Sequence, residues 1–522
     1  MKKNIVFRFF ALVVGIALCF NLTACRKTQK SYSYFISDEV PGTSGGGNSG
    51  AASGDKAATT DTKGGKTGDN TGSGNKSENK GGGKGTTVKV AINSGRPTDT
   101  APLFDALAKE YPNIKVNIDY YTSDLANSQE YIAAKSASGT LPDVVFDDIA
   151  NLPLYVSQGL VYPLDEFVKN DAEFKYIPQS FIDDYTYGGR LYALPHQAYF
   201  TACIMNLDAL DALNVDLPPL DWNMDQFKQF CINVSKNGYS ACERLFYLEY
   251  YASGSYSKTA GYCGYNSKTR SFEMTGTLAK SAKLFSELRK IPNVEAFSLR
   301  ASGEYLKRFG SEDEWGATKL GKTVMLDFEK GTYSKNYVDE LCSNFNWTFW
   351  PYPQNIKGRM PIHIDHAFML ANTKNPDAAF KVLSFLTYSK KGNLARINAY
   401  TDKANGKGKY KLNLDYYTPT TSQPDVVNAY KKLVKGDEVQ MYLYNNMGNC
   451  FRGEPDKFVP SFGSNWAEVI QPMCNKMEDG TKDPDSTCKD LQTKATNSLK
   501  TYWNDFDAKL KKVQAEWDKN HK

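Results

Sequence analysis

Two short stretches of the sequence carry residue types that could do chemistry by themselves. The first, His363-Ile364-Asp365-His366, offers two imidazoles and a carboxylate, which are groups that hold Zn²⁺ in proteins. On an extended strand, however, His363 and Asp365 point to one face and His366 points to the other, so only two of the three would converge. The sequence shows no third ligand nearby, and we therefore predict no metal site.

The second stretch, residues 316–323 (GATKLGKT), matches the phosphate-binding pattern GxxxxGK[ST]. That pattern binds phosphate when a buried strand precedes it and a helix follows it, because the backbone amides then converge on the anion. Here the acidic residues 311–314 precede the pattern, and the apolar residues 324–326, which are typical of a strand, follow it. The order of elements is reversed, so we predict neither a bound nucleotide nor any other cofactor.

A third set of residues suits carbohydrate. Sugars present C–H faces that pack on aromatic rings, and hydroxyls that need charged or amide partners. Arg96, Asp147, Asp148 and Asn151 supply polar partners, although ordinary surface ion pairing would explain these four equally well. Trp350 lies where Pro351 and Pro353 interrupt a strand, so its ring is a candidate for stacking. These residues form the first part of a predicted sugar site.

The elements that position these side chains alternate along the chain. Residues 88–92, 114–121 and 143–146 have the pattern of strands, and apolar residues at helical spacing lie between them in 103–111 and 131–137. Strands that alternate with helices in this way form a parallel sheet with right-handed crossovers. Ligands of such α/β sheets bind at the carboxyl ends of the strands, which is where Arg96, Asp147 and Asp148 lie.

The N-terminus predicts export and anchoring. Basic residues precede the apolar run 9–20, which is too short to span a bilayer and is typical of a signal peptide. It ends in Leu22-Thr23-Ala24-Cys25, which resembles the bacterial lipobox, in which the cysteine takes a lipid. Residues 1–24 are therefore the predicted lipoprotein signal peptide. Residues 25–87 are predicted to be the lipidated N-terminus and a disordered glycine-rich tether.

The net charge argues against one class of function, and the cysteine content suggests disulfides. Removing the three basic residues of the signal from the formal charge of +5 leaves about +2, which argues against a protein that binds nucleic acid. Outside the signal and the lipobox eight cysteines remain, an even number that suggests disulfides in an exported protein, although some could be buried thiols. We predict one disulfide, between Cys474 and Cys488, because the helices expected over 466–477 and 488–513 flank a short turn at Gly480 and Pro484.

Several ordered stretches resemble the extracellular solute-binding proteins of family 1, the maltose-binding-protein-like components of ABC importers. The matching segments are 141–145 (LPDVV), 158–165 (QGLVYPLD), 189–195 (GRLYALP), 221–227 (DWNMDQF), 321–325 (GKTVM), 349–353 (FWPYP) and 374–380 (KNPDAAF). The resemblance implies an α/β fold of two lobes, with parallel-type sheets flanked by helices and a hinge between the lobes. It implies an N-terminal lobe of 88–200 and 352–405, and a C-terminal lobe of 201–351 and 406–522.

The resemblance also implies further ligand residues. Asp365 and His366 would lie on a strand returning to a cleft between the lobes, Trp466 would hold the place of a sugar-stacking ring, and Tyr199 and Tyr247 are weaker candidates of the same kind. We accordingly predict a non-enzymatic monomer, anchored by lipid on the extracytoplasmic face of the cell membrane. It would capture an oligosaccharide and deliver it to a membrane permease. The alternatives are a cell-surface glycoside hydrolase, or the same fold binding a non-sugar solute.

Overall fold

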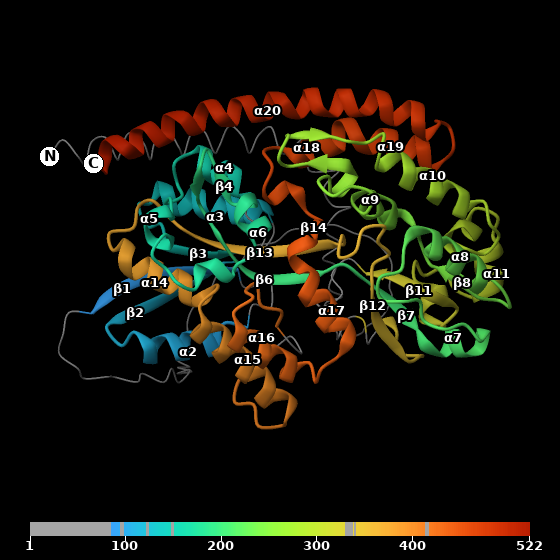
Figure 1. Cartoon of the computed structure of the whole chain (residues 1–522), viewed down its shortest axis with the longest axis horizontal. Helices are drawn as coiled ribbons and strands as arrows, with labels where there is room; N and C mark the ends of the chain where they lie inside the picture. Colours follow the sequence, from blue (N-terminus) through green and yellow to red (C-terminus); the bar gives the residue numbers. More distant parts are fainter. Residues whose placement is uncertain are drawn as a thin grey trace, which may run out of the picture. The chain divides into compact units, whose positions relative to one another are not determined.

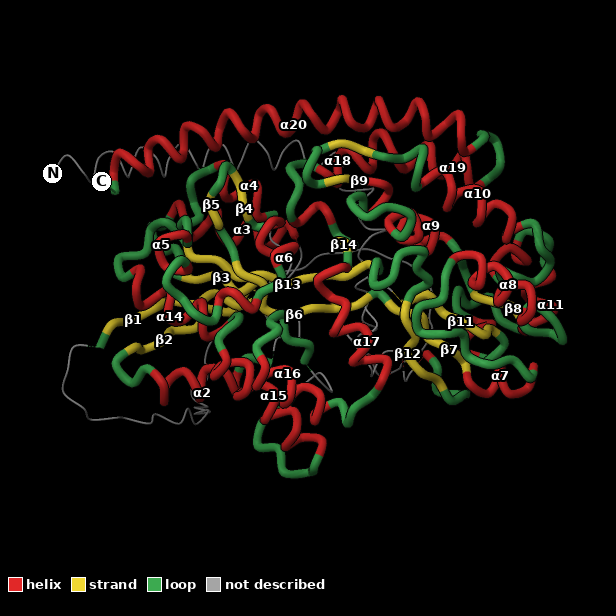
Figure 2. The backbone as a smooth tube through the Cα atoms, viewed as in Figure 1, coloured by secondary structure: helices red, strands yellow, loops and turns green. Residues whose placement is uncertain are grey.

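The computed structural model describes residues 85–93, 99–121, 125–147, 151–328, 338, 341–412 and 417–521. The predicted signal peptide, the tether and the lipidation residue Cys25 lie outside these residues. The described part has the two-lobed, mixed α/β fold that the sequence predicts (Figure 1). Lobe 1 is built on a sheet in the order β14-β13-β3-β1-β2 with β6 paired to β13, and lobe 2 on a sheet in the order β12-β7-β11-β8 (Figure 2).

Lobe 1 begins with the alternation that the sequence predicts. The elements are β1 (Thr86–Asn93), α2 (Ala101–Glu110), β2 (Ile114–Tyr121), α3 (Leu125–Ala137) and β3 (Val144–Asp147). Strand β1 pairs in parallel with both neighbours, so that Val90 lies opposite Ile118 on one side and Val144 on the other. Val88, Val90, Ala91 and Ile92 of β1 are buried, as are Leu103 and Leu107 of α2, and these side chains belong to the core of this lobe.

Two strand connections join the lobes. Strand β6 (Leu194–Phe200) pairs with β13 (Pro361–Met369) in lobe 1, whereas β7 (Ala202–Asn206) pairs with β11 (Thr323–Phe328) and β12 (Trp347–Pro351) in lobe 2. Only Thr201 separates β6 from β7, and the chain returns to lobe 1 between β12 and β13. All residues of β6, β7 and β13 are buried, so the crossing lies inside the protein rather than on its surface.

Lobe 2 surrounds β8 (Ser240–Cys242), β11, β7 and β12 with α8 (Met224–Val234), α9 (Phe246–Gly254) and α10 (Leu278–Arg289). Helix α8 begins with a capping box, in which Asn223 and Gln226 bond to each other's backbone amides. Helix α12 (Gly316–Lys319) lies inside the GATKLGKT pattern, and β11 follows it. A strand therefore follows the pattern, as expected, and the helix that a phosphate site requires at this place is missing.

The remaining elements of lobe 1 and its neighbourhood lie between these strands and near the C-terminus. They are α4 (Leu152–Ser157), α5 (Asp165–Val168), η1 (Phe174–Tyr176), α6 (Gln179–Asp184), β4 (Thr186–Tyr187), β5 (Arg190–Leu191), α14 (Pro376–Leu386), α15 (Lys390–Ala404), α16 (Pro424–Leu433), α17 (Glu438–Asn446), η4 (Met447–Asn449), β14 (Phe451–Arg452) and η5 (Pro455–Lys457). Those of lobe 2 are α7 (Leu207–Leu213), η2 (Tyr262–Gly264), β9 (Tyr265–Asn266), β10 (Ser271–Phe272), η3 (Phe297–Arg300), α11 (Glu304–Phe309) and α18 (Phe462–Asn465).

The chain ends in the two helices that the sequence predicts. A π-helical turn, η6 (Trp466–Ile470), leads into α19 (Gln471–Glu478), and α20 (Pro484–Asn520) follows. Asp483 caps α20 by accepting a hydrogen bond from the Ser486 amide, with Pro484 at the first helical position. With 37 residues α20 is about 55 Å long. Neither α20 nor any other helix in the described ranges is both long enough and apolar enough to cross a membrane.

The predicted disulfide between Cys474 and Cys488 is wrong. No disulfide joins any of the eight cysteines in the described ranges, and all eight are buried. The turn does bring α19 and α20 together, but the Cys488 thiol meets Met477 Sδ at 3.7 Å, one helical turn beyond Cys474. Helix packing therefore places the Met477 thioether against Cys488.

Candidate functional site

The structure describes some of the predicted ligand residues fully, some only by their backbone and some not at all. Arg96 and Asp148 lie outside the described residues, and of Asp147 and Tyr247 only the backbone is described. The backbone of Asp147 lies directly opposite His366 across the β3–β13 pair. The side chains of the other six candidates are described; these are Asn151, Tyr199, Trp350, Asp365, His366 and Trp466.

A chain of polar side chains fills the place where the strands cross between the lobes. Strand β13 presents His363 and Asp365 on one face. His363 Nε2 lies 3.2 Å from Thr201 Oγ1, and His363 Nδ1 lies 3.1 Å from Glu454 Oε1. Lys457 Nζ then lies 2.7 Å from Glu454 Oε2 and 3.3 Å from Asp365 Oδ1. We call these five residues, Thr201, His363, Asp365, Glu454 and Lys457, the crossing cluster.

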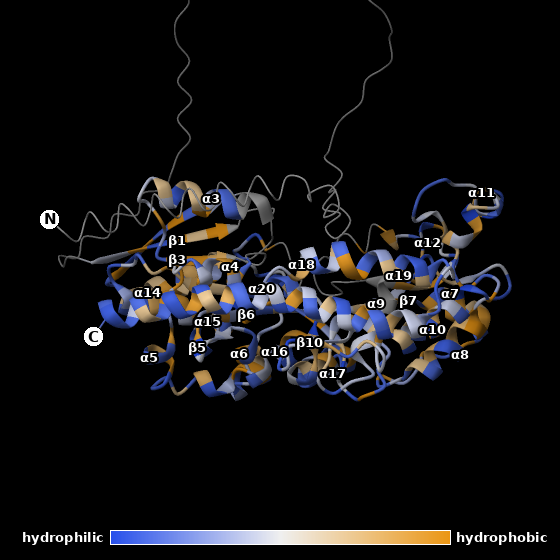
Figure 3. Cartoon of the chain, turned by 90° about the horizontal axis from the view of Figure 1, so that it is seen from above, coloured by the Kyte–Doolittle hydropathy of each residue, from blue (hydrophilic) through white to orange (hydrophobic). Residues whose placement is uncertain are grey.

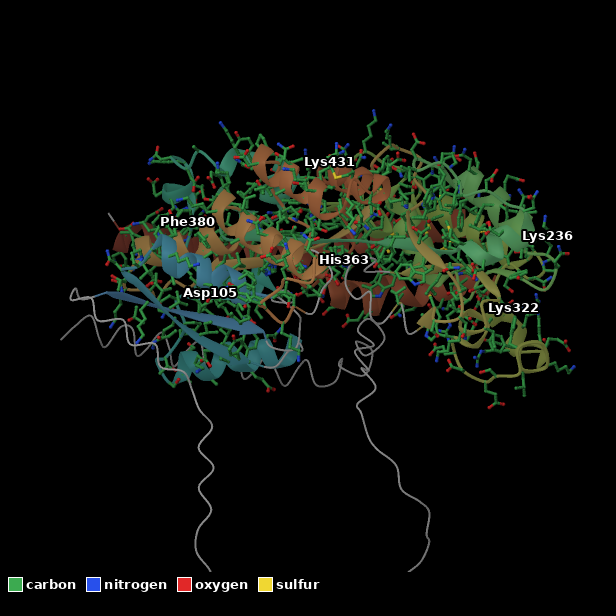
Figure 4. All side chains as sticks on the ribbon, turned by 90° about the horizontal axis from the view of Figure 1, so that it is seen from below. Asp105, Lys236, Lys322, His363, Phe380 and Lys431 are labelled. Carbon is green, nitrogen blue, oxygen red and sulfur yellow. The ribbon has the colours of Figure 1, made fainter. Side chains whose placement is uncertain are left out.

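The position of the crossing cluster follows from the elements that carry it. In Figure 4, His363 lies near the middle of the molecule. Asp105 and Phe380 of lobe 1 lie on one side of it, and Lys236 and Lys322 of lobe 2 lie on the other. Gly453 allows the segment that carries Glu454 and Lys457 to approach β13, because a Cβ at this position would lie 2.8 Å from His363 Nε2.

Asn151 links the start of α4 to the segment that carries Glu454 and Lys457 of the crossing cluster. Its side-chain carbonyl caps α4 by accepting from the Leu154 amide at 3.1 Å, and its Nδ2 donates to the Asp456 carbonyl at 3.3 Å. Two predicted ligand residues, Asn151 and Asp365, therefore both contact the 454–457 segment. The structure brings them together although they are more than two hundred positions apart.

Burial sets the protonation of the carboxyl group beside the crossing cluster. The pKa of Asp456 is raised to about 6, because burial disfavours the charged form and the nearby Glu454 carboxylate repels it, against a smaller opposite effect of Lys457. The carboxyl therefore holds its proton to higher pH than an exposed aspartate would. Close to Asp456, the positive charge of Lys457 pairs with the carboxylates of Asp365 and Glu454.

Two further histidines are buried next to the crossing cluster. His366 lies on the face of β13 opposite Asp365 and packs against Tyr185, with the ring centroids 5.6 Å apart. His196 is the extra residue of a bulge in β6 and stacks on Phe146 at 3.9 Å. Burial lowers the pKa of His196 well below its ordinary value, with a further contribution from Arg396, so this imidazole is neutral.

The aromatic candidates differ in exposure. Trp466 is 4% exposed and packs between Tyr250 and Tyr262, with ring centroids 4.9 and 5.6 Å away. Tyr199 is equally enclosed and lies opposite His363 in the β6–β13 pair. Trp350 is partly buried, like the neighbouring Trp347 and Phe349, which pack against the core of lobe 2. Its indole Nε1 has no hydrogen-bond partner among the described residues.

The sequence did not indicate four residues of this region: Thr201, Glu454, Asp456 and Lys457. The only local signal is the density of charge in residues 454–457, which is equally typical of an exposed turn. Lys457 and Asp365 are 92 positions apart, and only the pairing of β14 with β13 brings them together. No group of three or more potential metal ligands lies within the described ranges.

Comparison with known proteins agrees with this geometry. Residues 93–393 match the family model described as bacterial extracellular solute-binding protein. A binding protein of Brucella abortus (strain 2308) is 23% identical over 419 residues, which cover 77% of this chain and 90% of that protein. The chain also resembles an ABC substrate-binding protein of Listeria monocytogenes solved with cycloalternan, with 13% identity and a TM-score of 0.57. The superposition covers 80% of this chain and 99% of that one.

A sugar transporter of Rhizobium etli, solved in an open conformation, has a TM-score of 0.59 at 17% identity and covers 79% of this chain and 99% of its own. Two lobes joined by buried crossing strands form a periplasmic-binding-protein-like fold. The chain belongs to the bacterial extracellular solute-binding protein family. Members of this family bind solutes for ABC importers and are not enzymes, which removes the glycoside hydrolase alternative.

Proposed function

We propose that this protein captures a carbohydrate between its lobes and delivers it to the permease of an ABC importer. The observation that carries the proposal is the crossing cluster, together with Asn151, at the point where the two lobes meet. Carboxylate, amide, imidazole and ammonium groups are the partners that sugar hydroxyls need. The related proteins that were solved with cycloalternan or as a sugar transporter support the same class of ligand.

All ten residues that were predicted as ligand contacts remain part of the proposed site. Trp350 offers a partly exposed ring on which a sugar could stack. Asn151, Asp365 and His366 would meet hydroxyls near the crossing. The remaining proposed contacts are Arg96, Asp147, Asp148, Tyr199, Tyr247 and Trp466.

A thermal-shift screen of the mature chain tests the ligand class. A ligand at one hundred times its dissociation constant stabilises a protein by about 2.7 kcal/mol, which is visible as a rise in melting temperature. We expect such a rise with at least one mono- or oligosaccharide. Peptides and polyamines serve as the comparison panel. A rise with those compounds and none with any sugar would show that the fold serves another solute.

We also propose a lipid anchor at Cys25, because a thiol at the lipobox position is the group that takes the diacylglyceryl chain. Cys25→Ser should then leave an unprocessed precursor, while the parent is cleaved and stays with the membranes after alkaline wash. Cys19→Ser, within the signal peptide, is the matched control and should change neither result. A Cys25→Ser protein that is still cleaved after Ala24 and still resists the wash would contradict the anchor.

Delivery to a permease is testable in cells that grow on the sugar found in the screen. Deleting the gene should abolish uptake of the labelled sugar at low concentration, and expression of the parent should restore it. Incubation of the purified protein with the same sugar should yield no hydrolysis product. Product formation would argue for an enzyme instead.

A further inference from the structure

Helix α20 contacts both lobes along its length. Its first part, residues 484–505, lies on lobe 2, where Asp485 pairs with Lys283 of α10. Further along, Gln492 Oε1 accepts from the Thr275 amide at 3.2 Å, and Thr496 Oγ1 accepts from the Phe272 amide at 3.1 Å. Figures 1 and 3 both show α20 running from the neighbourhood of α10 towards that of α14.

The second part of α20, residues 506–520, lies mainly on lobe 1, although Asp507 near its start still pairs with Arg270 of lobe 2 at 2.6 Å. Gln514 Nε2 donates to the carbonyl oxygens of Tyr187 and Gly188 at 3.2 and 3.3 Å. Trp517 packs edge-on against Tyr162 with ring centroids 4.6 Å apart, and Asp518 pairs with Arg190 at 2.8 Å. We call residues 506–520 the strap.

The strap approaches lobe 1 closely at one glycine. A Cβ at Gly188 would lie 2.8 Å from Gln514 Nε2 and 2.9 Å from a methyl carbon of Leu510, and φ at this glycine is +56°. Both the space and the backbone conformation therefore suit glycine. The close fit at Gly188 shows that this part of α20 is tightly packed against lobe 1.

The elements that α20 touches also carry proposed ligand residues. On lobe 1, α20 packs against α4, which begins at Asn151, and Val513 packs on Gly159 just beyond that helix. On lobe 2, Asn465 Nδ2 donates to the Ala495 carbonyl at 3.0 Å, one residue before Trp466. A single helix thus supports one proposed contact in each lobe.

We propose that the strap positions the two halves of the ligand site by limiting how far the lobes can part. This inference rests on the proposed function for its effect on affinity. Bending at the crossing strands would change the spacing of α4 and η6, and a continuous helix docked on both lobes opposes that change. A site that is held near its bound spacing loses less freedom when ligand binds, so docking of the strap strengthens binding.

The strap is tested in the full mature chain by Gln514→Ala combined with Trp517→Ala. Lys511→Ala combined with Lys512→Ala is the matched control, because both lysines are exposed on the same helix. Spin labels at Lys109→Cys and Lys236→Cys, which are exposed on lobe 1 and lobe 2, report the distance between the lobes. Cys25→Ser in all versions prevents labelling at that position, and the eight cysteines in the described ranges are buried.

Without any ligand, we expect the strap variant to show a broader distribution of inter-lobe distances than the parent and the control. With maltotriose and cycloalternan as probes, we expect affinity to fall 5- to 50-fold in the strap variant, and Trp517→Phe alone to stay near the parent. Circular dichroism checks that each variant folds, and Asp518→Arg provides a milder release if the double variant does not.

An unchanged distance distribution in a folded strap variant would overturn the inference. So would a broader distribution with unchanged affinity, because the strap would then not position the site. A parent that binds neither probe, together with a screen in which no sugar raises the melting temperature, would overturn the proposed function instead. The ligand-free distances would still decide whether the strap restrains the lobes.

Discussion

The crossing cluster and the aromatic residues around Trp466 are buried to a similar degree but are held by different forces. In the crossing cluster, Lys457 balances Asp365 and Glu454 at 3.3 and 2.7 Å. Around Trp466, ring–ring packing against Tyr250 and Tyr262 replaces charge. Phe462, which packs on Tyr262, completes this second group, which we call the aromatic pack.

The difference matters because the two kinds of contact respond differently to change. Ring packing is nearly non-directional and is lost in proportion to the surface removed. A buried ion pair adds little net stability to the folded protein. Removing one partner destabilises the protein strongly, because the other charge remains buried. The aromatic pack should therefore carry stability, whereas the crossing cluster should carry specificity and pH dependence.

Trp466→Ala should have the largest effect, because it empties a large buried site. We expect a loss of about 3–5 kcal/mol in the free energy of unfolding, measured by denaturant titration. Trp466→Phe keeps most of the packing and should lose markedly less. A loss below about 1 kcal/mol for the alanine variant would show that the ring is not part of the core.

Lys457→Met should be next in size. It leaves Asp365 and Glu454 buried near each other without this cation, and we expect a loss of about 3 kcal/mol at pH 8. Adding Asp365→Asn should recover part of that loss, since the charge left behind is removed. Additive effects of the two substitutions in the double-mutant cycle would contradict the coupling that the 3.3 Å contact implies.

Asp456→Asn tests the raised pKa next to the crossing cluster. A folded-state pKa of about 6, above the unfolded value, means that the folded protein holds a proton that the unfolded chain has lost between about pH 4 and 6. This group therefore adds stability at low pH, and the contribution disappears as pH rises through 6.

The measurement for Asp456→Asn is the free energy of unfolding of parent and variant from pH 4.5 to 8. We expect the variant to gain about 1–3 kcal/mol relative to the parent over that range. Asp425→Asn, at an exposed ion pair, is the control for general charge effects. A constant difference between parent and variant across the range would mean that Asp456 titrates normally.

The smallest expected effect is on binding rather than on stability. Asn151→Ala removes a cap of α4 and an amide that reaches the 454–457 segment. We expect sugar affinity to fall about 5- to 30-fold, or about 1–2 kcal/mol, by titration calorimetry. Asn223→Ala removes a comparable cap from α8 in lobe 2 and should leave affinity unchanged. Equal affinities in parent and Asn151→Ala would remove Asn151 from the proposed site.

Local patterns predicted the elements well. The β1–α2–β2–α3–β3 order, the strand after GATKLGKT and the last helix all follow from periodicity, although α20 begins at Pro484, four residues before the predicted start. The disulfide prediction failed for a reason that lies beyond local patterns. The turn between α19 and α20 was placed correctly, but the rotation of the helices that puts Met477 opposite Cys488 depends on packing against the rest of lobe 2.

Sequence alone determined the class of fold, because alternating periods and ordered family segments depend on neighbours within a few positions. It also indicated Asn151 beyond the carboxyl end of a strand, and the family resemblance indicated Asp365 on a strand that returns to the cleft. Only the tertiary structure decided that these two meet Glu454, Asp456 and Lys457, that Trp466 is enclosed, and that α20 reaches both lobes. Such contacts join residues tens to hundreds of positions apart, and they depend on strand pairing and helix rotation, which leave no periodic signal in the chain.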